Sequence, residues 1–270
     1  MSPDEKLARL FDHQLRLHAA HYSNMGSGRA DSAAHLDVLF HRLLDLLRPA
    51  LFVEVGAYRA EASRRVKLDH PDTRVVAFEA NRYNHEAVSA EHDFEESGIS
   101  YLNLAVSDQP GTVTFHLRRA VEGEALRPLT GNSSLLRRLE GAVEYEPLAV
   151  PSVTLDEFFA ADIASEHRAA TWIDVEGASG LVLGGATTFL GTCDLVMIEV
   201  EEKPMWEGQW LSLDVLTALV SRGFVPVARD IEYENQFNFV LASAEFSRRP
   251  EVLLALELHD NYLVHHLTGD

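Results

Sequence analysis

The sequence predicts an α/β fold with a parallel, doubly wound sheet, and three observations support this. An apolar run at 51–55 is followed by a glycine, a helix-like segment and a second apolar run at 75–78, which together make a strand–helix–strand unit. Further short apolar runs alternate with helical patterns toward the C-terminus. The chain has 270 residues, enough to bury one sizeable core. We therefore expect one main domain at 50–245.

The segment 1–49 predicts two helices before the main domain. Residues 2–5, Ser-Pro-Asp-Glu, have the pattern of a helix start, and a second amphipathic pattern follows a glycine-containing break. We expect this helical segment to pack on the main domain or on a partner subunit. His18 and His21 are three residues apart, but no acid or cysteine accompanies them at ligand spacing. Surface or lid histidines are therefore expected here, rather than a metal site.

The strand–helix–strand unit at 51–81 indicates a nucleotide-type ligand. A glycine at the first turn, Gly56, lets a ligand approach the backbone, and Glu79 lies about 20 residues further on, where an acid binds a ribose diol. The alternative is an ordinary structural unit without a ligand. A dinucleotide would need further glycines, but Tyr58, Ala60 and Glu61 occupy those positions. Acids around the turn would repel a pyrophosphate and suit an amino group and a sulfonium, which favours S-adenosylmethionine over a nicotinamide dinucleotide.

The next segment predicts a helix at 84–96 and a third strand at 100–106. The end of that strand is where an adenine would lie, because ligands gather at the carboxyl ends of strands. Residues 112–154 then alternate as an antiparallel insertion, and such insertions often supply substrate contacts. Asn132 and Ser133 are candidates there for recognising a hydroxyl, although a plain turn explains them equally well.

Acidic residues follow two later strands. The run 171–175 is followed closely by Glu176 and contains Asp174, and the run 194–200 contains Glu199 near its end. By the carboxyl-end rule these acids face the reacting group. They are candidate catalytic residues, because a carboxylate can accept a proton directly or can hold a divalent cation such as Mg²⁺ that polarises a diol. The alternative for Glu176 is a structural role at a helix N-terminus.

The C-terminal part continues the α/β pattern. Residues 203–210 read KPMWEGQW, and Trp206 and Trp210 are candidates for a sugar-stacking platform or for a packing lid. Runs at 224–227 and 237–241 predict two closing strands. The segment 246–270 predicts a helical tail.

Four motifs in order along the chain resemble one family: VEVGAYRAEAS, FEANRYN, NLAVSD and WIDVEGASGLVLGGA. The sequence resembles the FkbM family of S-adenosylmethionine-dependent methyltransferases over roughly residues 50–242. The resemblance implies a Rossmann-like, seven-stranded class I methyltransferase sheet. Ala60 stands where the family usually has a second glycine. From the residues and the resemblance together, we expect the cofactor to contact Glu54, Gly56, Ala57, Tyr58, Glu61, Glu79, Ala80, Asn81, Ala105, Val106, Ser107 and Asp174.

Composition limits the classes of partner. There are 42 acidic and 23 basic residues and the net charge is −19, which argues against binding to nucleic acid or to an anionic membrane. Cys193 is the lone cysteine, no apolar run reaches membrane-spanning length, and the N-terminus is polar. We therefore expect a cytoplasmic enzyme that acts on a small-molecule or saccharide substrate and can form a homo-oligomer.

The resemblance implies O-methylation of a hydroxyl, and we expect a sugar or a glycosylated natural product as the acceptor. An O-methyltransferase of a non-sugar small molecule is the first alternative. An NAD-dependent oxidoreductase and a non-catalytic interaction protein that kept the fold are the alternatives of other classes.

Overall fold

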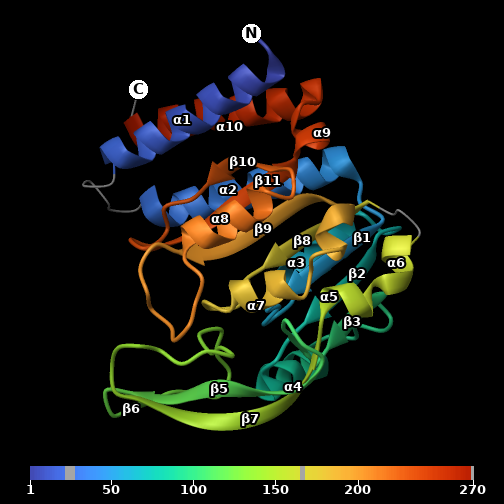
Figure 1. Ribbon diagram of the computed structural model, residues 1–270, viewed down its shortest axis with the longest axis vertical. Helices are drawn as coiled ribbons and strands as arrows, with labels where there is room; N and C mark the ends of the chain where they lie inside the picture. Colours follow the sequence, from blue (N-terminus) through green and yellow to red (C-terminus); the bar gives the residue numbers. More distant parts are fainter. Residues whose placement is uncertain (22–27, 165–167, 269–270) are drawn as a thin grey trace.

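The computed structural model describes residues 1–21, 28–164 and 168–268. Its centre is a seven-stranded sheet with the order β10-β11-β9-β8-β1-β2-β3 (Figure 1). All pairs are parallel except those made by β11, which runs antiparallel to both neighbours. The expected doubly wound α/β sheet is confirmed. The strands are β1 (Leu51–Val55), β2 (Arg74–Phe78), β3 (Ile99–Leu102), β8 (Ala169–Ile173), β9 (Cys193–Glu201), β10 (Phe224–Arg229) and β11 (Gln236–Ser243).

Helices cover both faces of this sheet. Adjacent residues of β1 serve opposite faces, because Phe52 packs in the core with α2, α3 and α10, whereas Val53 packs in the core with α7 and α8. Both faces of the strand are apolar for this reason. The helices are α1 (Pro3–His21), α2 (Gly28–Leu47), α3 (Glu61–Asp69), α4 (Arg82–Glu91), α5 (Leu155–Phe158), α6 (Ala160–Ala164), α7 (Ser179–Gly184), α8 (Ser212–Val220), α9 (Ala244–Ser247) and α10 (Pro250–Thr268).

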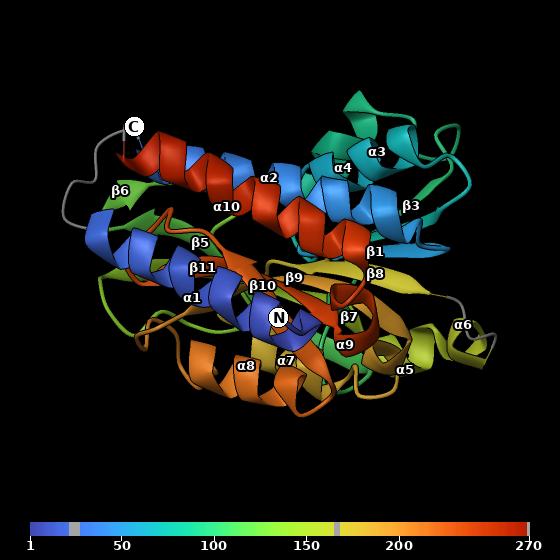
Figure 2. The ribbon, with the colours of Figure 1, turned by 90° about the horizontal axis from the view of Figure 1, so that it is seen from above.

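The N-terminal helices share the core of the main domain. Leu36, Phe40 and Leu43 of α2 are fully buried in the core that includes Phe52. Figure 2 shows α10 lying between α1 and α2, so the two ends of the chain form one helical layer. Among the described residues, no helix combines the length and apolar character needed to cross a membrane.

The expectation of surface histidines in α1 is wrong for His18, which is 1% exposed. Neither of its ring nitrogens has a hydrogen-bond partner among the described residues. Burial, helped by the positive charge of Arg229, lowers the pKa of His18 to about 3. The side chain of His21 lies outside the described residues.

The residues between the third and fourth strands of the main sheet form a second, four-stranded sheet. Its order is β4-β7-β5-β6, and its long strands β5 (Gly111–Val121) and β7 (Val143–Val153) pair antiparallel, as the alternation at 112–154 predicts. The short strands are β4 (Ala105–Val106) and β6 (Glu124–Ala125). This sheet lies apart from the main sheet, next to α4 (Figure 1).

One expected strand is two strands in two sheets. Residues 100–106 divide into β3, in the main sheet, and β4, in the second sheet. The division falls at Asn103, whose Nδ2 donates to the carbonyl oxygens of Glu79 at 2.8 Å and Ala80 at 3.2 Å. The Asn103 side chain thus hydrogen-bonds to two backbone carbonyl oxygens just after β2. These bonds hold the chain across the end of β2, where it leaves the main sheet.

Candidate active site at the carboxyl ends of the strands

The turn after β1 requires a glycine at position 56. Gly56 has φ +83°, and a Cβ at this position would lie 1.7 Å from the backbone oxygen of Asp174. The close approach of the ends of β1 and β8 therefore excludes any side chain here. Tyr58 and Ala60 follow with φ values of +43° and +52°, so Ala60 adopts the left-handed conformation that a glycine adopts more easily. Ala60 also precedes the first residue of α3.

Glu79 connects this turn to the end of β2. Its Oε2 accepts a hydrogen bond from the backbone N–H of Tyr58 at 2.6 Å, and its Oε1 accepts one from the backbone N–H of Asn81 at 2.6 Å. The side chain is 5% exposed, and burial raises the pKa of Glu79 to about 7 against the effect of these hydrogen bonds. Each carboxylate oxygen has a second lone pair, so Glu79 can still accept from a ligand.

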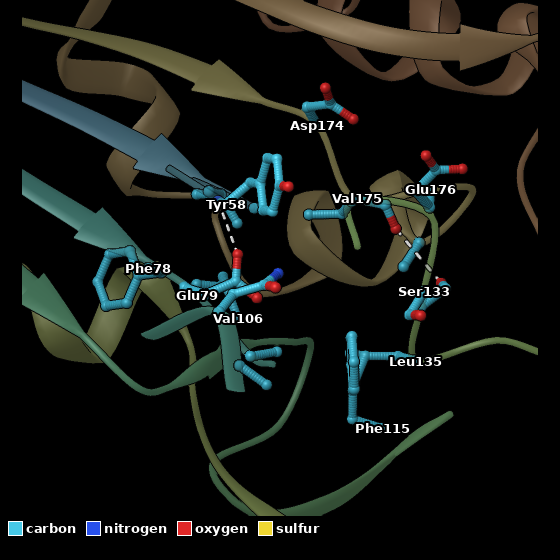
Figure 3. A pocket seen from close by; sticks show the side chains of 18 of the residues that line it. Tyr58, Phe78, Glu79, Val106, Phe115, Ser133, Leu135, Asp174, Val175 and Glu176 are labelled. Atoms are coloured by element: carbon cyan, nitrogen blue, oxygen red, sulfur yellow. Dashed lines mark hydrogen bonds between the residues drawn. The ribbon is translucent and has the colours of Figure 1, made fainter. Parts of the chain in front are cut away.

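A first cavity opens beside Glu79. In Figure 3, Phe115 and Leu135 lie at one end of this cavity, and Asp174 and Glu176 lie at the other. The structure thus joins an apolar end to an acidic end. Seven of the twelve expected cofactor contacts line it: Gly56, Tyr58, Glu79, Ala80, Ala105, Val106 and Asp174.

The other five expected contacts do not line the cavity. Glu54 is buried, and its Oε2 accepts from the backbone N–H of Ser63 at 2.8 Å, which fixes the first turn of α3. Burial also raises the pKa of Glu54 to about 7. Asn81 caps α4 by accepting from the backbone N–H of Tyr83. The remaining three are the buried Ala57, the exposed Glu61 and Ser107, whose hydroxyl bonds to Asp108.

A second, wider cavity of about 800 Å³ adjoins the first. The two cavities share five lining residues: Gly56, Tyr58, Gly131, Asp174 and Glu176. Its other walls come from α2, from β5, from the loop that contains Asn132 and Arg138, and from the connection between β10 and β11. Of the expected substrate contacts, Asn132 lines the second cavity and Ser133 lines the first.

Three carboxylates meet where the cavities join. One side-chain oxygen from each of Asp174, Glu176 and Glu199 can be chosen so that all lie within 4.8 Å of one another. Burial raises the pKa of Asp174 to about 6, and burial together with repulsion from Asp174 raises the pKa of Glu176 to about 8. The same two causes raise the pKa of Glu199 well above its ordinary value. The strand tips therefore bring these three expected catalytic residues together.

Two features of this cluster show local strain or unmet bonding. Glu176 has φ +52°, a left-handed conformation that costs about 1–2 kcal/mol for a residue other than glycine. Glu199 is 8% exposed, and its Oε1 has no hydrogen-bond partner among the described residues. A buried polar atom without a partner is unfavourable, so this oxygen is a candidate to bind a ligand or a cation.

Of the two interpretations of the tryptophans, a sugar platform or a packing lid, the structure contradicts the platform at Trp206. Trp206 is 1% exposed and packs under the turn after Asp174, where a Cβ on Gly177 would lie 2.3 Å from its Cδ1. Trp210 also packs against a glycine, Gly180, but it is 39% exposed and lines neither cavity. The glycines of this turn and of α7 leave space for the two rings, so the rings serve packing.

The methyltransferase FkbM domain, as a family model, matches residues 54–226. The chain belongs to the FkbM methyltransferase family. A comparison with curated proteins found no match.

Solved structures similar to this FkbM methyltransferase have low identity. The Burkholderia thailandensis 1,6-didemethyltoxoflavin-N1-methyltransferase is 13% identical over 90% of this chain and 91% of that chain, with a TM-score of 0.41. The bifunctional kinase-methyltransferase WbdD is 12% identical over 80% of this chain and 39% of that chain, with a TM-score of 0.43. Human N-acetylserotonin methyltransferase is 10% identical over 76% of this chain and 50% of that chain, with a TM-score of 0.38.

Sequence reasoning missed several residues of this FkbM methyltransferase site. Asn84 lines the first cavity, and Arg118, Arg138 and Asn238 line the second. Arg118 carries a signal in the sequence, because Phe115 and Leu117 alternate inward on β5 and the next residue must face the other side. Asn238 carries the same signal, because it lies on β11 between the buried Phe237 and Phe239. Arg138 carries none, since its position depends on how its loop folds back over the sheet.

Proposed function

We propose that this protein transfers a methyl group from S-adenosylmethionine to a hydroxyl oxygen of a polyhydroxylated acceptor such as a sugar or a glycosylated natural product. The observation that carries the proposal is the position of the carboxylate cluster. Asp174 and Glu176 line both cavities, so a donor in the first cavity and an acceptor in the second would meet at these acids.

The first cavity fits the parts of S-adenosylmethionine. Val106, Phe115 and Leu135 offer an apolar surface for an adenine at one end. Glu79 has lone pairs free for a ribose diol, and Asp174 at the other end suits a cationic group. The turn at Ala60 lacks the further glycines that a pyrophosphate would need, which disfavours a nicotinamide dinucleotide.

When bound, S-adenosylmethionine supplies an electrophilic methyl carbon on a sulfonium. The chain then has to align an acceptor oxygen and remove its proton. A carboxylate with a raised pKa accepts a proton more readily than an ordinary one. Burial raises the pKa of Asp174, and burial together with repulsion from Asp174 raises the pKa values of Glu176 and Glu199. We assign them as the group that accepts the proton, with the charge shared among them.

The same three carboxylates fit a divalent cation such as Mg²⁺. Magnesium prefers oxygen ligands, and the cluster offers one oxygen from each residue, with Glu199 Oε1 lacking another partner. A cation held by Asp174, Glu176 and Glu199 would polarise an acceptor diol. The polar residues around the second cavity, among them Asn132 and Asn238, also suit a polyhydroxylated acceptor. The two tryptophans no longer support a sugar.

The first test is calorimetric titration with S-adenosylmethionine and S-adenosylhomocysteine. We expect micromolar affinity in the unaltered protein and a loss of at least about tenfold, roughly 1.4 kcal/mol, in Glu79→Ala. Glu61→Ala is the matched control, because this acid is exposed and lines neither cavity. No binding in the unaltered protein would contradict the proposal and favour a non-catalytic interaction protein.

The second test is transfer to acceptors. With cofactor binding retained, Asp174→Asn is expected to lose methyl transfer to glycosides and other polyols. Undiminished transfer by this variant would remove Asp174 from the assigned group. Product from a non-sugar hydroxyl alone would replace the saccharide with another small molecule as the acceptor.

A further inference from the structure

The second cavity has a basic wall as well as an acidic one. Arg118, from β5, and Arg138, from the loop that precedes β7, both line it. Both side chains are half-buried. Both guanidinium groups favour the ionised form of Glu176, which places them near the carboxylate cluster. The protein as a whole is strongly acidic, so this pair of arginines runs against its general charge.

Arg118 is held in place but has a free donor. Its backbone N–H donates to Ser133 Oγ at 3.1 Å, and its Nη1 donates to the backbone oxygen of Asn132 at 3.2 Å. Its Nε is buried and has no hydrogen-bond partner among the described residues. A buried donor without a partner is unfavourable, so a ligand that accepts from Nε would be favoured.

Arg138 is fixed by stacking. Its guanidinium lies 4.9 Å from the centre of the Trp206 ring, and its backbone N–H donates to the hydroxyl of Tyr145 at 2.9 Å. The buried indole therefore positions the arginine and lines neither cavity itself. This gives Trp206 a role that the sequence did not indicate.

The two arginines also repel each other. Burial and the charge of Arg138 both lower the pKa of Arg118. Within the part of the chain that the structure describes, neither guanidinium makes an ion pair within 4.0 Å. Two neighbouring guanidinium groups that make no direct ion pair can bind an oxyanion, because guanidinium groups match carboxylate and phosphate geometry.

We propose that Arg118 and Arg138 bind an oxyanion group, a carboxylate or a phosphate, on the acceptor. That the bound molecule is the methyl acceptor rests on the proposed function, whereas binding of an oxyanion by the two arginines does not. The arrangement sets the direction of the acceptor, because the arginines attract its oxyanion end while Asp174, Glu176 and Glu199 repel it. A hydroxyl at the opposite end is then turned toward the carboxylate cluster.

The competing explanation is that the arginines only offset the charge of the acids. It accounts for the effect on Glu176, but not for the unpartnered Nε of Arg118 or for the lack of a close contact between either arginine and a carboxylate. A group that served only the acids would gain most by direct contact with one of them.

The experiment is a thermal-shift titration of the full chain with inorganic phosphate and with acetate, against chloride at equal ionic strength. We expect a saturable rise in Tm with phosphate or acetate that chloride does not produce. Arg118→Gln and Arg138→Gln are each expected to weaken the midpoint at least about tenfold, roughly 1.4 kcal/mol. A clear preference for phosphate would indicate a phosphorylated acceptor, and parity with acetate would indicate a carboxylate.

The chain provides a matched control beside each arginine. Arg119 follows Arg118 on β5 and pairs with Glu146 at 3.7 Å, and Arg137 precedes Arg138 and lies over the ring of Tyr145. Neither lines the second cavity, so Arg119→Gln and Arg137→Gln are expected to leave the midpoint unchanged.

The proposal would be overturned if phosphate and acetate raise Tm no more than chloride does. It would also be overturned if the titration midpoint is unchanged in both Arg118→Gln and Arg138→Gln. A lower Tm in those variants with an unchanged titration midpoint would show that the arginines only offset the charge of the acids. Titration of the same samples with S-adenosylhomocysteine tests the proposed function separately, since anion binding at the arginines does not require the donor.

Discussion

Replacing Glu176 by glutamine is expected to stabilise the protein at alkaline pH. The pKa of Glu176 is raised from 4.5 to about 8 by burial and by repulsion from Asp174 and Glu201. A group whose pKa is higher in the folded state contributes stability that is complete below the unfolded pKa. That stability is lost as the pH rises through the folded pKa. The relevant window therefore runs from about pH 4.5 to about pH 8.

The structure sets the size of the effect. One pKa unit corresponds to about 1.4 kcal/mol, so the full shift gives an upper limit of about 5 kcal/mol above pH 8. The Glu176 side chain is partly exposed, and solvent screening reduces this limit. We expect a gain of about 1–2 kcal/mol for the variant, or a rise in Tm of about 2–6 °C for a chain of this size.

The assay is thermal unfolding of Glu176→Gln and the unaltered protein with a chelator present, at about pH 5.5 and about pH 8.5. The variant is expected to gain much more stability at the higher pH. At about pH 5.5 only the first part of the window above pH 4.5 has been crossed, whereas at about pH 8.5 the whole window has been crossed. Glu207→Gln, which removes an exposed acid outside both cavities, is the control and is expected to show no pH-dependent gain. Equal Tm changes at the two pH values would refute the reasoning. Methyl transfer by Glu176→Gln is expected to fall by about 10²-fold or more, so that stability and activity change in opposite directions.

Three further predictions concern other parts of the site. Gly177→Ala is expected to lower the free energy of unfolding by about 3 kcal/mol, because its Cβ would meet a buried indole at a φ of +81°. Gly208→Ala, at a φ of +74° but with open space around it, should cost only about 1–2 kcal/mol, and equal losses in urea unfolding would contradict the role of the indole. Mg²⁺ at about 100 times its Kd should stabilise the protein by about 2.7 kcal/mol, an effect that Glu199→Gln should abolish; an unchanged Tm in the unaltered protein would argue against a cation site. Asn103→Ala removes the side-chain hydrogen bonds to the carbonyl oxygens of Glu79 and Ala80 and is expected to weaken S-adenosylhomocysteine binding about tenfold by calorimetry. Undiminished affinity would show that these two hydrogen bonds do not position Glu79 and Ala80 for the cofactor.

Local patterns were sufficient to predict the main sheet. The apolar runs at 51–55 and 75–78 are buried on both faces, and a strand of this kind reads clearly in a sequence. Gly56 and Glu79 mark the ends of neighbouring strands, so the rule about carboxyl ends brings them to one cavity. Asp174, Glu176 and Glu199 come together for the same reason.

Contacts between distant segments were beyond local patterns. Glu54 lies one residue before the end of β1, but its carboxylate turns to the backbone of α3 instead of the cavity. In the sequence, Trp206 and Trp210 resemble ligand-stacking residues. Their contacts with Gly177 and Gly180 are visible only in the folded chain. Arg138 depends on the same tryptophan for its position. Side-chain direction in loops follows from tertiary packing, which a single sequence does not specify.

The two cavities draw on different parts of the chain. Every residue that lines the first cavity falls within 55–178, inside the segment that defines the family, 54–226. The second cavity also uses Ala33 and Asp37 before that segment, and Tyr233 and Asn238 after it. Sequence change at the two ends can therefore reshape the second cavity, the proposed acceptor site, while leaving the first cavity intact. Chains that share the central segment but differ at their ends are expected to keep one methyl donor and to diverge in what they methylate.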